Sequence, residues 1–215
     1  MKNLPSIFLL FFFLITFSLR GQDQISMLSK SKGFAVGVHA AYISHENDLY
    51  HTEPEYGVGY GLGIQYGIDH NIAVAISYQH YSIEAKSGNS LVKRYPLFEY
   101  DILGKYIFGS STSRFRPSVL AGFNFTNTEE GYHYDQLGNF TDVYTTEEYY
   151  GKTFLAGAGL SYYFNPNISA DLNVKVHVGK FTKVYLTSNY TPTEEGEIST
   201  DVFNLNGQLG FQYHF

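Results

Sequence analysis

Three polar residues at every second position form a candidate hydrolytic site near the end of an alternating segment. His80, Ser82 and Glu84 would lie on one face of an extended strand, because successive side chains of a strand point to opposite sides. An imidazole at this spacing can act as the base that activates the Ser82 hydroxyl. We therefore take His80, Ser82 and Glu84 as candidate catalytic residues. A polar collar where a strand leaves a membrane would also explain them.

A second set of ionisable residues occupies one face of two other alternating segments, 95–108 and 168–185. If this face lines a narrow lumen, its acidic and basic side chains should pair, because an unpaired buried charge is costly. Such a network would be either a structural polar plug or a narrow path for ions or protons. The predicted lumen network comprises Glu99, Asp101, Lys105, Asp171, Lys175 and His177.

Eight segments of the chain alternate between apolar and polar residues with a period of two. In 57–68, for example, Val58, Leu62 and Ile64 alternate with glycines and Gln65, and a helix would mix these two sets. The apolar face is aliphatic and aromatic, which is typical of strands with lipid outside and a polar lumen inside. The outer faces of a soluble β-sandwich, the competing fold, should be charged instead. The predicted strands are 33–44, 57–68, 72–83, 95–108, 115–126, 149–164, 168–185 and 203–215.

The connections between these segments alternate in length. Residues 69–71, 109–114 and 165–167 are short turns, whereas 45–56, 85–94, 127–148 and 186–199 are long and polar. Outer-membrane barrels place short turns in the periplasm and long loops outside the cell. The sequence therefore predicts an all-β, eight-stranded antiparallel up-and-down transmembrane β-barrel with both termini in the periplasm.

The start of the chain resembles a secretory signal. Lys2 precedes an apolar run over 7–17 that is too short to cross a bilayer as a helix. We expect a signal peptide over 1–21, with an uncleaved anchor as the alternative, then a periplasmic lead-in over 22–32 and a barrel domain over 33–215. The absence of cysteine excludes disulfides, thiolate metal sites and a lipid-modified N-terminal cysteine.

Charge and histidine spacing exclude several other functions. The formal net charge of −6 argues against a nucleic-acid partner. His51, His70, His133 and His214 occur singly and show no metal-ligand spacing. We therefore expect neither a cofactor nor a metal site.

Two of the predicted loops, 45–56 and 127–148, are rich in acidic residues, and the second also contains four aromatic residues and no lysine or arginine. Acidic oxygens can hold hard divalent cations, but neither loop has the residue order of an EF-hand. Tyrosine provides contact area at a low entropy cost, and long loops on a rigid barrel are natural sites of recognition. We therefore expect 45–56 and 127–148 to be the binding site of an extracellular ligand.

With these features, residues 33–215 resemble the small outer-membrane β-barrels of Gram-negative bacteria, of the OmpA and OmpX type. The most specific part is the last strand, in which Leu209, Phe211, Tyr213 and Phe215 are similar to the signal read by the barrel-assembly machinery. This resemblance implies location in the outer membrane and contact with its lipid. Separately, His80-Tyr81-Ser82 resembles the His-x-Ser element of outer-membrane lipid A deacylases, although that family carries the element near its C-terminal end.

Three functions follow from these expectations. The first is a non-enzymatic barrel that stabilises the outer membrane or binds a surface partner through its loops. The second is a lipid-modifying hydrolase that uses His80 and Ser82. The third is a narrow channel or transport accessory. Because the hydrolase pattern covers so few positions, we expect the first function.

Overall fold

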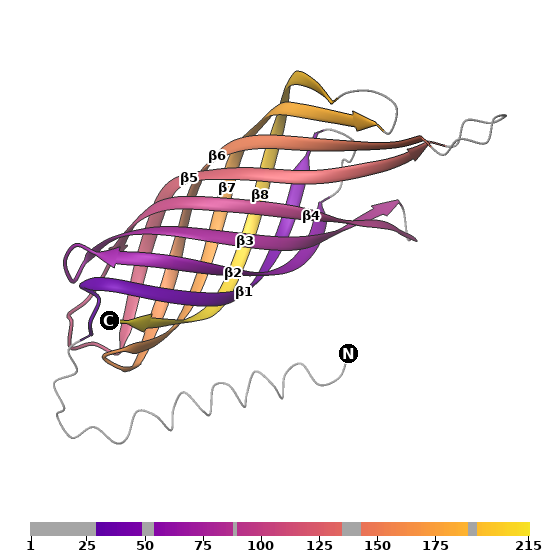
Figure 1. Cartoon of the computed structure of the whole chain (residues 1–215). Helices are drawn as coiled ribbons and strands as arrows, with labels where there is room; N and C mark the ends of the chain where they lie inside the picture. Colours follow the sequence, from indigo (N-terminus) through magenta and orange to yellow (C-terminus); the bar gives the residue numbers. More distant parts are fainter. Residues whose placement is uncertain (1–28, 49–53, 88–89, 135–142, 189–192) are drawn as a thin grey trace.

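The computed structural model describes residues 29–48, 54–87, 90–134, 143–188 and 193–215. The described residues form eight antiparallel strands that follow one another around a closed barrel (Figure 1). Among these residues, no helix is long and apolar enough to cross a membrane. The strands are β1 (Gly33–Asn47), β2 (Glu55–Gly67), β3 (Ile72–Ser87), β4 (Ser90–Ile107), β5 (Phe115–Tyr134), β6 (Val143–Asn165), β7 (Ile168–Ser188) and β8 (Glu194–His214).

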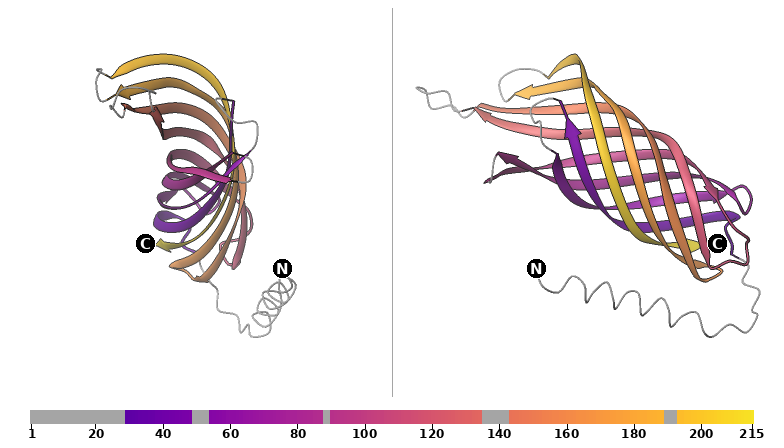
Figure 2. Two further views of the ribbon diagram at one scale, coloured as in Figure 1. Left: turned by 90° about the vertical axis from the view of Figure 1, so that its right-hand side faces the viewer. Right: turned by 180° about the vertical axis from the view of Figure 1, so that it is seen from behind.

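The barrel closes because its first and last strands pair. The ladder between β1 and β8 runs from Ala35 opposite His214 to Asn47 opposite Val202. It leaves no sheet edge within the wall, which is the requirement for a β-structure in lipid. Seen from the side and from behind, the strands are strongly tilted around the barrel (Figure 2). The predicted fold class is confirmed.

Alternation along each strand produces an apolar outer belt. In β5 the exposed apolar positions run from Phe115 to Phe125, and in β6 they run from Phe154 to Phe164. Each run matches the roughly 9–11 residues that a tilted strand needs to cross a bilayer. Aromatic pairs such as Phe34–Tyr66 and Tyr42–Tyr56 lie towards its two rims, as in the girdles of membrane barrels. The outer face is therefore suited to lipid.

The strands extend further than their apolar pattern predicts. β5 has 20 residues, β6 has 23, and β7 and β8 have 21 each, about twice the length needed to cross the bilayer. The expected loop 127–148 is thus wrong in large part, since β5 continues to Tyr134 and β6 begins at Val143. The apolar alternation stops where the outer face no longer meets lipid. The strands continue beyond that point, because backbone hydrogen bonding between neighbouring strands does not depend on apolar side chains. The expected loop 45–56 is shorter for the same reason.

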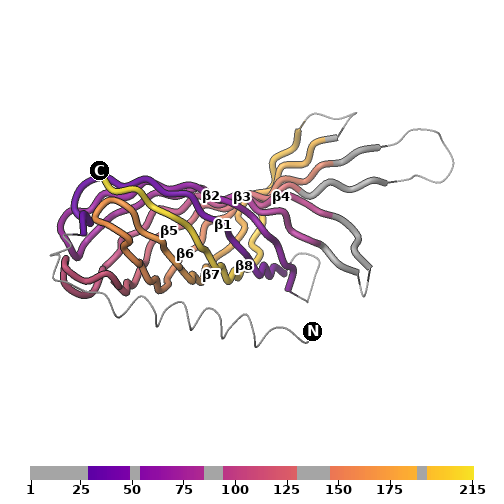
Figure 3. Tube along the Cα trace, turned by 90° about the horizontal axis from the view of Figure 1, so that it is seen from below, coloured from indigo at the N-terminus to yellow at the C-terminus, as the bar shows by residue number. Residues whose placement is uncertain are grey.

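The extra length forms an open sheet, which we call the distal sheet (129–134, 143–150, 180–188 and 194–201). The β5–β6 ladder reaches Tyr134 opposite Val143, whereas the β4–β5 ladder stops at Leu97 opposite Thr128. The strands consequently separate from the rest of the barrel at this end (Figure 3). The opposite end, the turn end, carries the short connections after β2, β4 and β6, as predicted from 69–71, 109–114 and 165–167.

Candidate functional site

The barrel interior contains a buried polar network in three layers. In the layer nearest the distal sheet, Glu99 on β4 accepts hydrogen bonds from the amide groups of Asn204 (2.8 Å) and Asn206 (2.6 Å) on β8. His177 on β7 places Nδ1 3.3 Å from Glu99 Oε1. The Glu99 and His177 side chains are completely buried, so the carboxylate depends on these neighbours in place of water.

The middle layer is organised around Asp101. Its Oδ2 accepts a hydrogen bond from the Lys175 ammonium, and its Oδ1 accepts one from Asn124 Nδ2 at 2.7 Å. Gln79 Nε2 and Ser77 Oγ each donate to Oδ2 at 3.3 Å. This carboxylate is paired with a cation and surrounded by donors, which is what a buried charge requires.

The third layer lies towards the turn end and is organised around Asp171. Ser161 and Ser169 donate hydrogen bonds to its two oxygens, the second at 2.8 Å, and Lys105 Nζ lies 3.9 Å from Oδ1. Ser169 also contacts His214 Nε2 at 3.0 Å. A cavity of about 70 Å³, lined in part by Lys105, Asp171 and Lys175, lies between this layer and the middle one. It has room for a few water molecules.

Apolar side chains close the lumen on the distal side of these layers. One inward-facing cluster comprises Ala41, Ile43, Tyr81, Ile83, Tyr95 and Leu97. Another comprises Tyr149, Phe181 and Val202, with Val184 and Ile198 packed against it. His45 lies close to the second cluster, with its ring 6.3 Å from that of Phe181. Water and ions would have to cross this apolar layer, which opposes conduction.

The segment before β1 closes the turn end. Ser29 N donates to Ser111 O at 2.6 Å, and the buried Arg116 donates to the hydroxyls of Ser29 (3.0 Å) and Ser31 (2.7 Å). Arg116 also donates to the carbonyl of His70 at 2.5 Å. We call residues 29–32, held in this way, the latch. The latch passes directly over Gly67, where an added Cβ would lie 1.7 Å from Ser31 O.

The candidate catalytic residues lie on the outer face of β3, at the distal rim of the apolar belt. His80 Nδ1 hydrogen-bonds with Tyr60 OH at 3.3 Å, and its ring stacks on Phe98 with centroids 4.8 Å apart. Glu84 pairs with Arg94 at 2.5 Å. The structure thus gives His80 an aromatic environment and a tyrosine partner, and does not supply the relay from His80 to Ser82 that a hydrolase needs.

The structure brings together all six residues of the predicted lumen network, from β4 and β7. Within the described chain, the group whose ligating atoms lie close enough to share a metal ion is Glu99, Asp101 and His177.

Sequence reasoning missed Arg116, although its inward parity in 115–126 was visible. It also missed the inward apolar residues Tyr95 and Leu97, which have the same parity as Glu99. Glu55, expected in a loop, is buried and accepts a hydrogen bond from Tyr95.

The outer face of the distal sheet is polar and mostly acidic. Tyr150 and Tyr185 form an edge-to-face pair with centroids 5.3 Å apart. Lys180 pairs with Asp201 at 3.1 Å, and Lys183 pairs with Glu195. Hydrogen bonding and attraction to Glu195 raise the pKa of Lys183, and the same contact lowers the pKa of Glu195. Counting both of its faces, the described acidic side chains of this sheet are Glu147, Glu148, Glu194, Glu195, Glu197 and Asp201, with Glu129 at its edge.

Solved structures with the same fold are outer-membrane proteins. Neisserial surface protein A is 17% identical with a TM-score of 0.52, and the match covers 86% of this chain and 98% of that one. OprG from Pseudomonas aeruginosa is 16% identical with a TM-score of 0.52, covering 86% and 96%. A major outer membrane protein from Thermus thermophilus is 11% identical with a TM-score of 0.59, covering 85% and 100%. No protein-family model matches the sequence, and no curated protein matches it.

The closed ladder, the apolar belt and these likenesses define the chain as a small membrane-spanning β-barrel with the fold of outer-membrane proteins. The resemblance inferred from the sequence is confirmed at the level of the fold. At these identities the neighbours show the architecture alone, so the function must be argued from the residues of this chain.

Proposed function

We propose that this protein is a non-enzymatic outer-membrane barrel that binds a surface partner through the distal sheet. The observation that carries the proposal is the contrast between the two ends of the molecule. The lumen is filled with paired polar side chains and covered by apolar clusters, whereas four strands continue beyond the membrane belt as an open sheet. A protein that only stabilised lipid would not need this extension.

In this arrangement the turn end, with Ser29 and Phe215 near it, faces the periplasm, and the distal sheet faces outside. Short turns in the periplasm and long extensions outside are the usual orientation of outer-membrane barrels. The barrel-assembly machinery and outer-membrane lipid are then the partners of the belt, and Leu209, Phe211, Tyr213 and Phe215 present the side chains that the machinery would read.

The charge of the distal sheet selects the kind of surface partner. Its described lysines, Lys180 and Lys183, are already paired with acidic residues of the same sheet. Acidic side chains remain in excess, so a partner with exposed basic groups is favoured over an acidic polysaccharide. The partly exposed Tyr150 and Tyr185 rings add contact area that does not depend on charge.

The test uses the protein in lipid nanodiscs with two fluorescent probes, an oligolysine and an oligoglutamate peptide. We expect the oligolysine to bind in a salt-sensitive way, and its binding to be lost when residues 129–148 are replaced by a short turn. A control variant altered at Ser110 and Thr112, in the turn at the opposite end, should bind normally. Normal binding by the shortened variant, or preference for oligoglutamate, would overturn the proposal.

The closed lumen is tested separately by planar-bilayer recording. We expect no discrete conductance from the purified protein, because the apolar clusters and the latch close the described lumen at its two ends. Stepwise currents that disappear on heat denaturation of the barrel would favour the narrow-channel alternative instead.

A further inference from the structure

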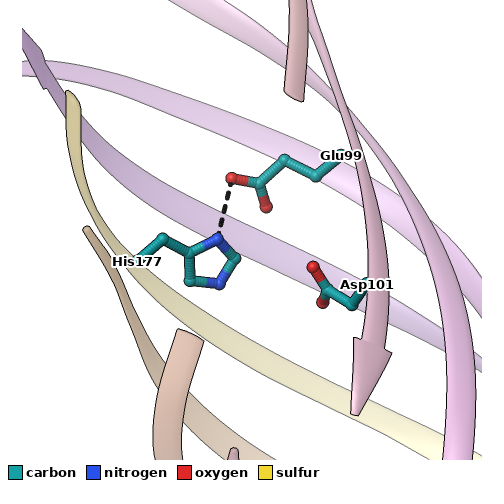
Figure 4. Close-up of side chains that lie close together, drawn as sticks. All are labelled: Glu99, Asp101 and His177. Atoms are coloured by element: carbon teal, nitrogen blue, oxygen red, sulfur yellow. Dashed lines mark ion pairs between the residues drawn. The ribbon is translucent and has the colours of Figure 1, made fainter. Parts of the chain in front are cut away.

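Three side chains that commonly bind metals converge inside the barrel. Glu99 and Asp101 are two positions apart on β4 and therefore point to the same side, and His177 reaches them from β7 (Figure 4). One ligating atom from each residue lies within 4.8 Å of the others, and each residue is 0% exposed. The cluster is built from strands far apart in the sequence, so spacing along the chain could not indicate it.

Among the described residues, the histidine in this cluster has no hydrogen-bond partner. His177 Nδ1 lies 3.3 Å from Glu99 Oε1 but outside hydrogen-bond geometry, and both ring nitrogens are buried without a partner. A buried polar group in this state carries a desolvation cost that native structures rarely leave uncompensated. The ring nevertheless points towards the two carboxylates (Figure 4).

The surrounding amides leave the cluster with an excess of acceptors. Gln79 donates to Asp101 through its nitrogen, while its Oε1 is buried without a donor. Asn206 donates to Glu99 in the same way, and its Oδ1 is also buried without a donor. The His177 imidazole and the two amide oxygens therefore lack donors beside two carboxylates that already accept hydrogen bonds. A cation would compensate for this shortage.

We propose that Glu99, Asp101 and His177 bind a divalent transition-metal ion, with zinc as the best fit. One imidazole nitrogen with two carboxylates is a donor set that Zn²⁺ accepts, in a tetrahedral site completed by water or an amide oxygen. Mg²⁺ and Ca²⁺ prefer oxygen ligands throughout, so the histidine disfavours them. The ion would join β4 to β7 across the lumen, a structural role independent of the distal sheet.

Lys175 is the competitor for this site, because its ammonium already pairs with Asp101. A dication and an ammonium repel each other, so the ion displaces Lys175 from the carboxylate. The cavity of about 70 Å³ on the Asp171 side of Asp101 is lined by both Lys175 and Asp171, which gives the ammonium space and a second carboxylate nearby. Removing the charge of Lys175 should therefore strengthen metal binding.

The experiment measures metal retention by the full protein, purified from outer membranes in detergent with a tag that contains no histidine. The protein is incubated with Zn²⁺, passed over a chelating resin and analysed by mass spectrometry for metal. We expect retention of a single equivalent by the native protein. His177→Gln should weaken zinc binding by about tenfold or more, since even the loss of a residue that only hydrogen-bonds to a metal ligand lowers metal affinity by ~10–100-fold. Lys175→Met should bind more tightly.

His214→Gln is the matched control, because His214 is also buried in the lumen but lies in the layer around Asp171. It should retain zinc as the native protein does. Glu99→Gln gives a second test if His177→Gln fails to fold. Co²⁺ provides a further measurement, through visible absorption bands of a tetrahedral site that His177→Gln or Glu99→Gln should remove. Absence of retained zinc in the native protein, or equal retention by folded His177→Gln, would overturn the proposal.

Discussion

The backbone amide of Phe215 donates a hydrogen bond of 2.9 Å to the carbonyl oxygen of Phe34, so the seam between β8 and β1 is closed down to the turn end. Both side chains point outward and are more than half exposed, at 64% for Phe215 and 59% for Phe34. The backbone of Phe215 thus seals the wall, while its ring faces the lipid rim.

These two roles of Phe215 are separable by mutation. Phe215→Asp keeps the backbone amide and places a charge at the lipid interface, where such a change costs only ~0–1 kcal/mol. We nevertheless expect a severalfold loss of folded protein in the outer membrane, because the assembly machinery would read the aromatic ring. The measurement is heat-modifiable mobility of outer-membrane fractions. Tyr213→Phe, which keeps an aromatic ring, is the control, and normal membrane levels of Phe215→Asp would refute the assembly role.

The membrane-spanning part of the fold was predictable because two solvents act on two faces of each strand. Lipid requires apolar side chains such as Phe123 and Val174 on one face, and the lumen accepts Asp101 and Lys175 on the other, so parity alone assigned them. The same parity placed Arg116 inward. Its hydrogen bonds to Ser29 and Ser31 were not predictable, because these serines precede the first strand and have no place in its alternating pattern.

The distal sheet was not predictable in this way, because its outer face is polar instead of lipid-facing and its inner face mixes apolar with acidic residues. Glu148 and Tyr150 are on the outer side and Glu147 and Tyr149 on the inner side, so the pattern no longer distinguishes strand from loop. The cluster of Glu99, Asp101 and His177 was missed as a unit for another reason. The alternation placed each of its members in the lumen. Which residues of β4 and β7 lie at the same height along the barrel axis, however, depends on the stagger of the strands in the closed barrel.

The pair between Lys175 and Asp101 should contribute strongly to the stability of the barrel. Lys175→Met leaves the Asp101 carboxylate buried without its cation, and we expect the free energy of unfolding to fall by about 3–5 kcal/mol. Urea unfolding in detergent, with a chelator present to remove any metal effect, provides the measurement. The double variant Lys175→Met/Asp101→Asn should recover much of the loss, since it removes both charges and keeps an acceptor for Asn124. Equal stability of the single and double variants would contradict this view.

The latch should be released by adding one methyl group to the wall beneath it. Gly67→Ala brings a Cβ within 1.7 Å of Ser31 O, a distance that forces the latch backbone to move. We expect the amides of Ser29 and Lys30 to exchange with deuterium about tenfold faster or more, while the strand ladders stay protected. Gly63→Ala is the control on the same strand, because its Cβ meets Ser77 Cβ at a milder 3.3 Å. Unchanged exchange at Ser29 in Gly67→Ala would show that the latch is not held there.

Replacing the candidate nucleophile should leave membrane lipid unchanged. His80 is engaged with Tyr60 and Phe98, so it does not serve as a base for Ser82 in this arrangement. We expect lipid A from cells that produce Ser82→Ala to have the same acyl chains as lipid A from cells that produce the native protein, by mass spectrometry. A host without the protein supplies the reference. An acyl chain that is missing with the native protein and restored by Ser82→Ala would revive the hydrolase hypothesis.

The turn between β2 and β3 should weaken in acid through a single carboxylate. Asp69 Oδ1 accepts hydrogen bonds from the backbone amides of Asn71 and Ile72, both at 2.7 Å, and these bonds hold the pKa of Asp69 below its ordinary 3.8. Because the folded pKa is the lower one, the stabilisation is complete above the ordinary pKa and is lost as the pH falls through the folded value. Carbon-detected NMR of the protein in detergent should show the Asp69 carboxyl titrating below pH 3.8, with the Asn71 and Ile72 amide shifts following it. Asp69→Asn should remove that pH dependence, and a carboxyl that titrates at or above 3.8 would show that the two bonds do not hold the turn.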